Sequence, residues 1–106
     1  MTINRRRFIA ERKLLVAKKG SADRKPVAIR ISEPFTVKQE DVTFPVDGII
    51  AGCHIAIEGL DVPGHDVYGM DSVQAVSLAS NIEPLVESMS VDFDFFWASG
   101  DPYFDR

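Results

Sequence analysis

The sequence lacks the features of membrane, secreted and disulfide-bonded proteins. Its one cysteine, Cys53, cannot form a disulfide within the chain, which is typical of a reducing compartment. No apolar run approaches the ~20 residues that cross a bilayer. The basic stretch Met1–Arg7 is not followed by the apolar core of a secretory signal. We therefore expect a cytoplasmic protein with no membrane association.

Metal and cofactor chemistry also has little support in the sequence. The potential metal ligands are few and have no zinc-like spacing: Cys53, His54, His65 and Asp66. If Ile55 and Val67 share one face of an antiparallel strand pair, the paired residue numbers add to an even sum. His54 and His65 then lie on opposite faces of the sheet. No glycine pattern resembles a phosphate loop. We predict neither a metal nor a cofactor.

One functional hypothesis is a hydrolase-like enzyme centred on His54, Glu58 and Asp66. Glu58 and Asp66 can lie across one hairpin on its solvent side, and paired carboxylates can perform acid–base catalysis. No hydrophobic pocket is indicated that would separate the pKa values of the two carboxyls. The serines have no nucleophile-elbow context. We therefore predict that the chain is not an enzyme and has no catalytic residues.

Alternating apolar and polar residues predict strands over 7–17, 27–32, 49–58, 65–70 and 91–97. The stretch Glu33–Asp47, punctuated by Pro34 and Pro45, is expected to be mostly loop. The whole chain is expected to form one α+β domain, with an antiparallel-dominated sheet of about five strands in the order β-β-β-β-α-β. The sequence does not predict where the last strand joins the sheet.

One long helix is predicted from Ser72 to Met89 and is expected to cover one face of the sheet. Asp71 can cap its first turn, and Gln74 can reach back to the cap. Pro84 lacks an N–H group, so a kink or a break into two helices is expected there. The apolar stripe of this helix consists of Ala75, Leu78, Ala79, Ile82, Leu85, Val86 and Met89. The apolar side of the following strand consists of Val91, Phe93, Phe95 and Trp97.

Charge is unevenly distributed along the chain. The first 38 residues hold eleven of the twelve Lys and Arg against three acidic residues, a net +8, and the remainder holds thirteen acidic residues against Arg106, a net −12. The first two predicted strands therefore form a basic hairpin. This hairpin is a candidate site for nucleic acid or another polyanion. One alternative is internal neutralisation, with Arg12, Lys13 or Arg30 beside Asp92 and Asp94. Another is a surface divided by charge that steers a partner or a second copy of the chain.

A sheet with a helix on only one face leaves its other face uncovered, which favours a second copy or a protein partner. Phe96, Tyr103 and Phe104 can form an apolar patch for such a contact, or can simply close the far edge of the sheet. No aromatic residue interleaves with the basic ones as a base-stacking surface requires. We therefore favour a non-enzymatic protein-interaction module, with a protein partner or as a homodimer, over a nucleic-acid binder. The residues predicted to contact the partner are Arg12, Lys13, Arg30, Phe96, Tyr103 and Phe104.

Three segments together resemble a family of small bacterial proteins of unknown function. They are Phe8-Ile9-Ala10-Glu11-Arg12, Gly69-Met70-Asp71-Ser72-Val73-Gln74-Ala75, and Trp97 followed by Gly100-Asp101 and Phe104. The chain departs from the family pattern at Ala98-Ser99 and Pro102-Tyr103. The resemblance implies the same α+β fold and a bacterial source, and it implies no activity.

Overall fold

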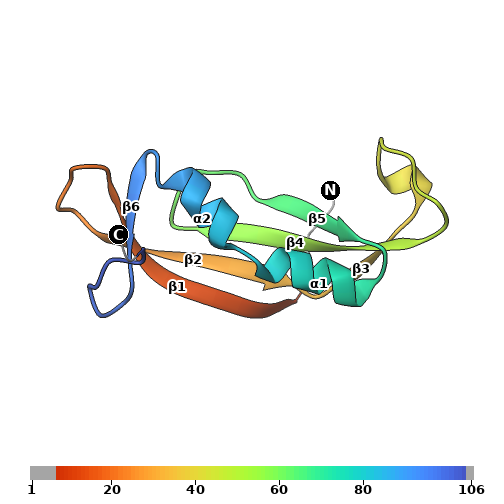
Figure 1. Cartoon of the computed structure of the whole chain (residues 1–106), viewed down its shortest axis with the longest axis horizontal. Helices are drawn as coiled ribbons and strands as arrows, with labels where there is room; N and C mark the ends of the chain where they lie inside the picture. The colour runs from red at the N-terminus through yellow and green to blue at the C-terminus, as the bar shows by residue number, and fades with distance from the viewer. Residues whose placement is uncertain (1–6, 105–106) are drawn as a thin grey trace.

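The predicted strands form an antiparallel meander, and the last strand joins it beside the first. The computed structural model describes residues 7–104, and their order along the chain is shown in Figure 1. The strands are β1 (Phe8–Lys18), β2 (Lys25–Ser32), β3 (Phe35–Val37), β4 (Ile50–Glu58), β5 (His65–Gly69) and β6 (Phe93–Phe96). The helices are α1 (Ser72–Ser80) and α2 (Glu83–Met89), with a short 3-10 turn at Gln39–Asp41. The α+β class predicted from the sequence is confirmed.

The sheet has six strands, because a short strand forms where mostly loop was expected. β3 pairs with residues 50–52 of β4, and β2 pairs with residues 55–58. Gly52 also pairs with β5, so β3 occupies the same edge of β4 as β2 does. Ser32, which is fully buried, bridges the gap between β2 and β3: its hydroxyl donates to the Glu33 carbonyl and accepts from the His54 N–H. Three residues of alternating pattern were too short a signal to predict β3.

The predicted helix is broken into two, as its proline indicated. α1 ends at Ser80 and α2 begins at Glu83, so Pro84 lies in the first turn of α2, where no N–H donor is needed. Asp71 caps α1 by accepting from the Gln74 N–H at 2.8 Å. The Gln74 side chain reaches back one residue beyond the cap and accepts from the Met70 N–H at 2.6 Å. The two helices cover one face of the sheet, with α1 packed on β4 and β5.

The core lies between this helix layer and the sheet. It contains Leu14, Val16, Val27, Ile29, Ile31, Ala51, Cys53, Ile55, Ala75, Ala79, Ile82, Val86, Phe95 and Tyr103. Three residues expected inside are exposed instead: Leu78 at 49%, Val91 at 73% and Trp97 at 40%. Leu78 is exposed because α1 lies over β4 and β5 and leaves the start of β1 uncovered. Val91, at 73% exposure, belongs to the turn before β6 rather than to the strand.

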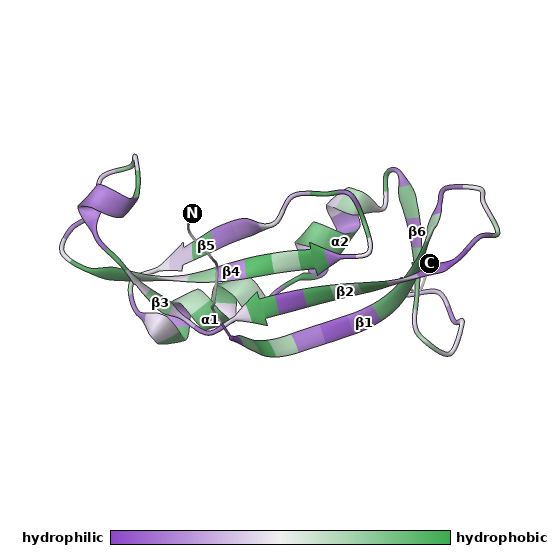
Figure 2. Ribbon diagram, turned by 180° about the vertical axis from the view of Figure 1, so that it is seen from behind, coloured by the Kyte–Doolittle hydropathy of each residue, from purple (hydrophilic) through white to green (hydrophobic). Residues whose placement is uncertain are grey.

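The face of the sheet away from the helices is charged in its middle and apolar toward its ends. Figure 2, which shows the sheet from behind, has hydrophilic residues in the centre of β1 between two hydrophobic ends. A shift in register between Phe8 and Ala10 turns Phe8 to this open face, beside Arg30, although the alternation placed it with Leu14. Phe35 and Tyr68 lie on either side of Gly52, where an added methyl group would meet the Phe35 ring at 2.8 Å.

Candidate interaction site

The basic hairpin is partly neutralised by the protein's own carboxylates. On the open face, Arg30 contacts Glu11 at 3.0 Å and Glu58 at 2.7 Å, and Lys13 lies 3.6 Å from Glu11. The hydrogen bond from Arg30 holds the pKa of Glu11 below its ordinary value. Lys19 pairs with Asp94 at 3.6 Å. Internal neutralisation therefore occurs, but not through the predicted pairing of Arg12, Lys13 or Arg30 with Asp92 and Asp94. That pairing was wrong because β6 reaches only residues 15–18 of β1.

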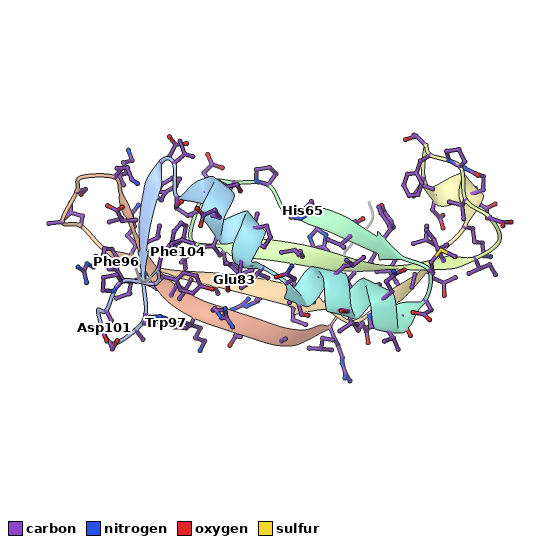
Figure 3. All side chains as sticks on the ribbon, in the orientation of Figure 1. His65, Glu83, Phe96, Trp97, Asp101 and Phe104 are labelled. Atoms are coloured by element: carbon purple, nitrogen blue, oxygen red, sulfur yellow. The ribbon has the colours of Figure 1, made fainter. Side chains whose placement is uncertain are left out.

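Arg12 lies on the opposite, helix-covered face, where it forms a cluster with two distant residues. Its guanidinium donates to Glu83 at 2.9 Å and to the Tyr103 hydroxyl at 2.7 Å. Tyr103 in turn donates to Glu83, and Trp97 lies against both Arg12 and Tyr103. Burial, followed by the hydrogen bond to Glu83, raises the pKa of Tyr103. Figure 3 labels Glu83 on α2 and Trp97 near β1. The cluster ties β1, α2 and the C-terminal segment together.

The three predicted aromatic contact residues do not form one surface. Phe96 lies on the open face of β6, covered by the Arg24 guanidinium 3.6 Å from its ring centre. Tyr103 is 8% exposed and belongs to the core, and Phe104 packs against it at 5.0 Å between ring centres. Phe96, Tyr103 and Phe104 therefore do not form the expected apolar patch. They fit the other expectation, that these rings close the end of the sheet.

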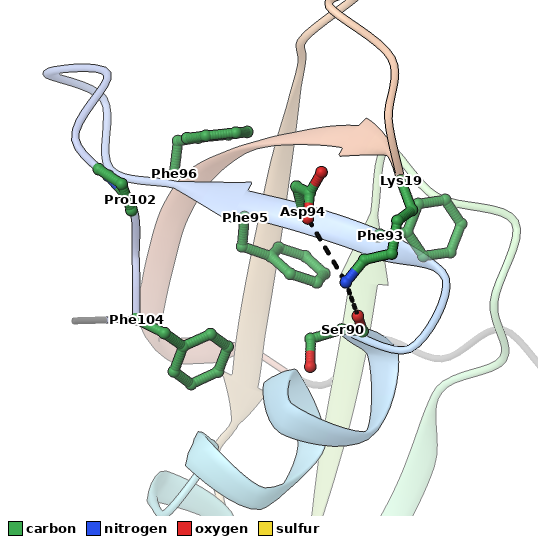
Figure 4. Close-up of a pocket in the computed structure, with 8 residues that line it drawn as sticks. All are labelled: Lys19, Ser90, Phe93, Asp94, Phe95, Phe96, Pro102 and Phe104. Atoms are coloured by element: carbon green, nitrogen blue, oxygen red, sulfur yellow. Dashed lines mark hydrogen bonds and ion pairs between the residues drawn. The ribbon is translucent and has the colours of Figure 1, made fainter. Parts of the chain in front are cut away.

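A cavity of about 530 Å³ lies between β6 and the end of α2 (Figure 4). Phe93, Phe95 and Phe104 line it, and Lys19 crosses its rim. The Lys19 ammonium donates to the Ser90 carbonyl at 2.8 Å and pairs with Asp94. Because this charge is already satisfied within the chain, the lining favours no class of charged ligand.

The residues of the enzyme hypothesis are divided between two places. His54 and Asp66 are directly opposite on β4 and β5 and contact each other at 2.7 Å. Glu58 lies further along β4 and is held by Arg30, beside a hollow lined by β1 and β2 rather than by His54 or Asp66. His65 pairs with Ile55, so the two histidines lie on opposite faces, as the parity of the pairing predicted. Within residues 7–104 there is no group of three His, Cys, Asp or Glu side chains placed to hold a metal ion.

The outer edge of β1 is the surface with the strongest features for binding. β2 pairs with β1 from Phe8 to Val16, whereas β6 pairs only from Leu15 to Lys18. Among residues 7–104, the stretch 8–14 therefore has a partner strand on one side only, and Figure 1 shows β1 along the rim of the sheet there. Phe8 and Ile9 are 43% and 47% exposed. The sequence did contain a signal for this edge, because the first predicted strand is longer than the last. The signal could not be used, because the sequence does not predict where the last strand joins the sheet.

The fold and this edge define the class of protein: an α+β domain with one six-stranded sheet, helices on one face, and an incompletely paired strand at the rim. No helix in the described part of the chain has the length and apolar character needed to cross a membrane. A scan of protein-family models and searches of curated proteins and solved structures gave no match. The resemblance to a bacterial family therefore stays a prediction.

Proposed function

We propose that the chain is a non-enzymatic interaction module that binds another protein chain along the outer edge of β1. The observation that supports this most directly is the seven-residue stretch from Phe8 to Leu14, which within the described part of the chain is paired on its β2 side alone. A sheet edge presents unpaired N–H and C=O groups that accept a further strand, and natural proteins usually keep such edges short or covered. This edge is long and begins with two exposed apolar side chains.

The edge is a better contact surface than the open face of the sheet. Arg30 is only 28% exposed in its side chain and is already held by Glu11 and Glu58. Binding a partner there would require these ion pairs to be desolvated, which costs free energy. The backbone groups of an edge strand instead gain hydrogen bonds when a strand is added, and this gain does not depend on charge.

A photo-crosslinking residue at position 9 tests the proposal in cells, with the same residue at the exposed position 91 as a matched control. Val91 is 73% exposed and lies in the turn before β6, away from the edge. We expect crosslinked protein from position 9 and little from position 91. The adduct is expected to disappear when Lys13→Pro is added, because proline removes an edge donor. Equal labelling from both positions would contradict the proposal.

Polyanion binding through the basic hairpin is the alternative function. Lys18 and Lys25 are exposed and have no ion pair with an acidic side chain of residues 7–104 in the structure, whereas Arg12, Lys13, Lys19 and Arg30 each have one. Binding to heparin or single-stranded DNA must weaken steeply with salt if phosphate or sulfate contacts dominate. Strand addition at β1 is expected to change much less over the same salt range, so a salt series separates the two functions.

A further inference from the structure

We infer that the chain bound at this edge is a second copy of the same protein, paired antiparallel to β1 in a register centred on Arg12. The inference rests on the proposed function and names its partner. It follows from three observations: the direction of the backbone groups along β1, the order of charges Glu11-Arg12-Lys13, and the point at which β6 ends.

The backbone groups of Glu11 and Lys13 point to the free edge. On the same side of β1, the Lys19 N–H donates to the Asp92 carbonyl at 3.0 Å, just before β6. Successive residues of a strand direct their N–H and C=O groups to alternate edges. The pairing of β1 with β2 is regular from Ala10 to Val16. The odd-numbered residues of this stretch therefore face outward, and the even-numbered ones face β2.

Of the symmetric registers centred on Glu11, Arg12 and Lys13, only the one centred on Arg12 places opposite charges directly across from each other. Hydrogen bonds across this edge require that residues pointing outward on one copy lie opposite residues pointing outward on the other. Because only odd-numbered residues point outward, the numbers of two paired residues add to an even sum, and the two-fold axis passes through a residue. Centring on Glu11 places this carboxylate opposite itself. Centring on Lys13 does the same for the ammonium and places Glu11 opposite Leu15, which already pairs with Phe96. Centring on Arg12 places Glu11 opposite Lys13 at both ends, with opposite charges facing each other.

This register is compatible with the residues on the helix-covered face. The two Arg12 side chains approach near the axis, but each is already balanced by its own Glu83 at 2.9 Å. Ala10, which is exposed, lies opposite Leu14 of the other copy. Ile9 of the second copy would lie opposite Leu15 of the first, which already pairs with β6. The second copy therefore leaves the pairing at Ile9, where its own β1 has the register shift. Trp97 follows β6 and is exposed at this point.

Another free edge of the sheet, the outer side of β5, lacks this complementarity. β5 has five residues, and symmetric pairing about Val67 places Asp66 opposite Tyr68. Asp66 is already engaged with His54, and the Phe44 ring packs on Tyr68 at 5.1 Å. No opposite-charge pair arises across such a contact.

The mass in solution, measured by light scattering over a concentration series, tests the inference. An interface formed by one strand and a few apolar side chains is small, so we expect a Kd on the order of micromolar or weaker. The mass should rise from 11.8 kDa toward about twice that value as concentration increases to about 1 mM. A chain that keeps the mass of one copy throughout overturns the inference.

Charge exchange tests the register. Lys13→Glu places two carboxylates opposite each other at both ends, and Glu11→Lys places two ammonium groups there, so each variant should dimerise about tenfold more weakly or worse. An equal mixture of the two variants restores opposite charges at both ends and should recover the dimer. Lys25→Glu has the same charge change at the exposed start of β2 and should dimerise as the unmodified chain does. A dimer unaffected by Lys13→Glu overturns this register.

Glu11→Lys also removes the bond to Arg30, so a backbone variant provides a second test. The Lys13 N–H faces outward, and Lys13→Pro deletes that donor without removing a bond to β2. Circular dichroism should show a folded chain, and light scattering should show one copy. A folded Lys13→Pro chain that still dimerises as before overturns the inference.

The crosslink at position 9 separates this inference from the proposed function. An adduct of two copies supports both. An adduct with a different protein that is lost in Lys13→Pro leaves strand addition intact and overturns the second-copy inference. The absence of any adduct that depends on position 9, together with a single-copy mass, overturns both.

Discussion

The hydroxyl of Tyr103 lies 2.7 Å from the guanidinium of Arg12, although the two residues are 91 positions apart in the chain. Glu83 accepts a hydrogen bond from each of them. The three side chains belong to β1, to α2 and to the segment after β6. They hold Arg12 on the helix-covered face, which keeps its positive charge balanced beside the proposed two-fold axis.

Removing the hydroxyl of Tyr103 is expected to destabilise the fold. Tyr103→Phe preserves the packed ring but deletes the hydrogen bonds to two charged groups, which is expected to lower the free energy of unfolding by about 1–2 kcal/mol. Urea unfolding measures this loss. Ser99→Ala, a polar deletion at an exposed position nearby, should change stability by less than about 0.5 kcal/mol. An equal loss of unfolding free energy in the two variants would show that the hydrogen bonds of the Tyr103 hydroxyl do not stabilise the fold.

Gly69 is expected to tolerate no side chain. An added methyl group would lie 2.5 Å from the Ala75 nitrogen and 2.9 Å from the Gln74 carbonyl carbon, both in the backbone of α1. Gly69→Ala must therefore push α1 away from β5, and we expect a loss of about 1–3 kcal/mol in urea unfolding. At Gly52 the obstacle is the Phe35 ring, which can rotate, so Gly52→Ala should cost less. The reverse order would show that α1 does not pack closely on β5.

Stability is expected to fall at alkaline pH. Burial raises the pKa of the Cys53 thiol above its ordinary value of 9.0, and burial also raises that of Tyr103 above 10.0. A pKa raised on folding means that the folded state holds its proton more tightly. Its stabilising effect is present below the ordinary value and is lost as pH rises through and above it. Thermal unfolding at a series of pH values should show this decline. It should be shallower in Cys53→Ala, and an unchanged slope would contradict the assignment to Cys53.

Hydrogen exchange is expected to alternate along β1. In dilute solution the amides of Arg12 and Leu14 face β2 and should be protected, whereas those of Glu11 and Lys13 face outward and should exchange quickly. The amide of Ala17 faces the same side as Lys13 but is opposite Asp94 of β6, so it should be protected. At high concentration, protection should extend to Glu11 and Lys13. Protection of these two amides in dilute solution would show that the edge is covered within one copy.

Much of the fold was determined by short-range patterns in the sequence. The strands of the meander follow from alternation, because a pleated strand turns successive side chains to opposite faces. The same parity placed His54 and His65 on opposite faces. Asp71 and Pro84 determined where the helices begin and divide, because a cap and a missing N–H act within one helical turn. These features depend on neighbours that are close in the chain.

The tertiary structure alone decided which distant residues meet. β6 joins β1 over residues 15–18. Among residues 7–104, residues 8–14 are therefore paired on their β2 side alone, and Asp94 pairs with Lys19 rather than with Arg12 or Arg30. Arg12 donates to Glu83, 71 positions away, and Glu83 is the first residue of α2 after the break between the helices. Leu78 is left exposed because α1 lies over β4 and β5. Many pairings of the edge strands satisfy the same alternation, and only packing of the whole sheet and its helices selects one of them.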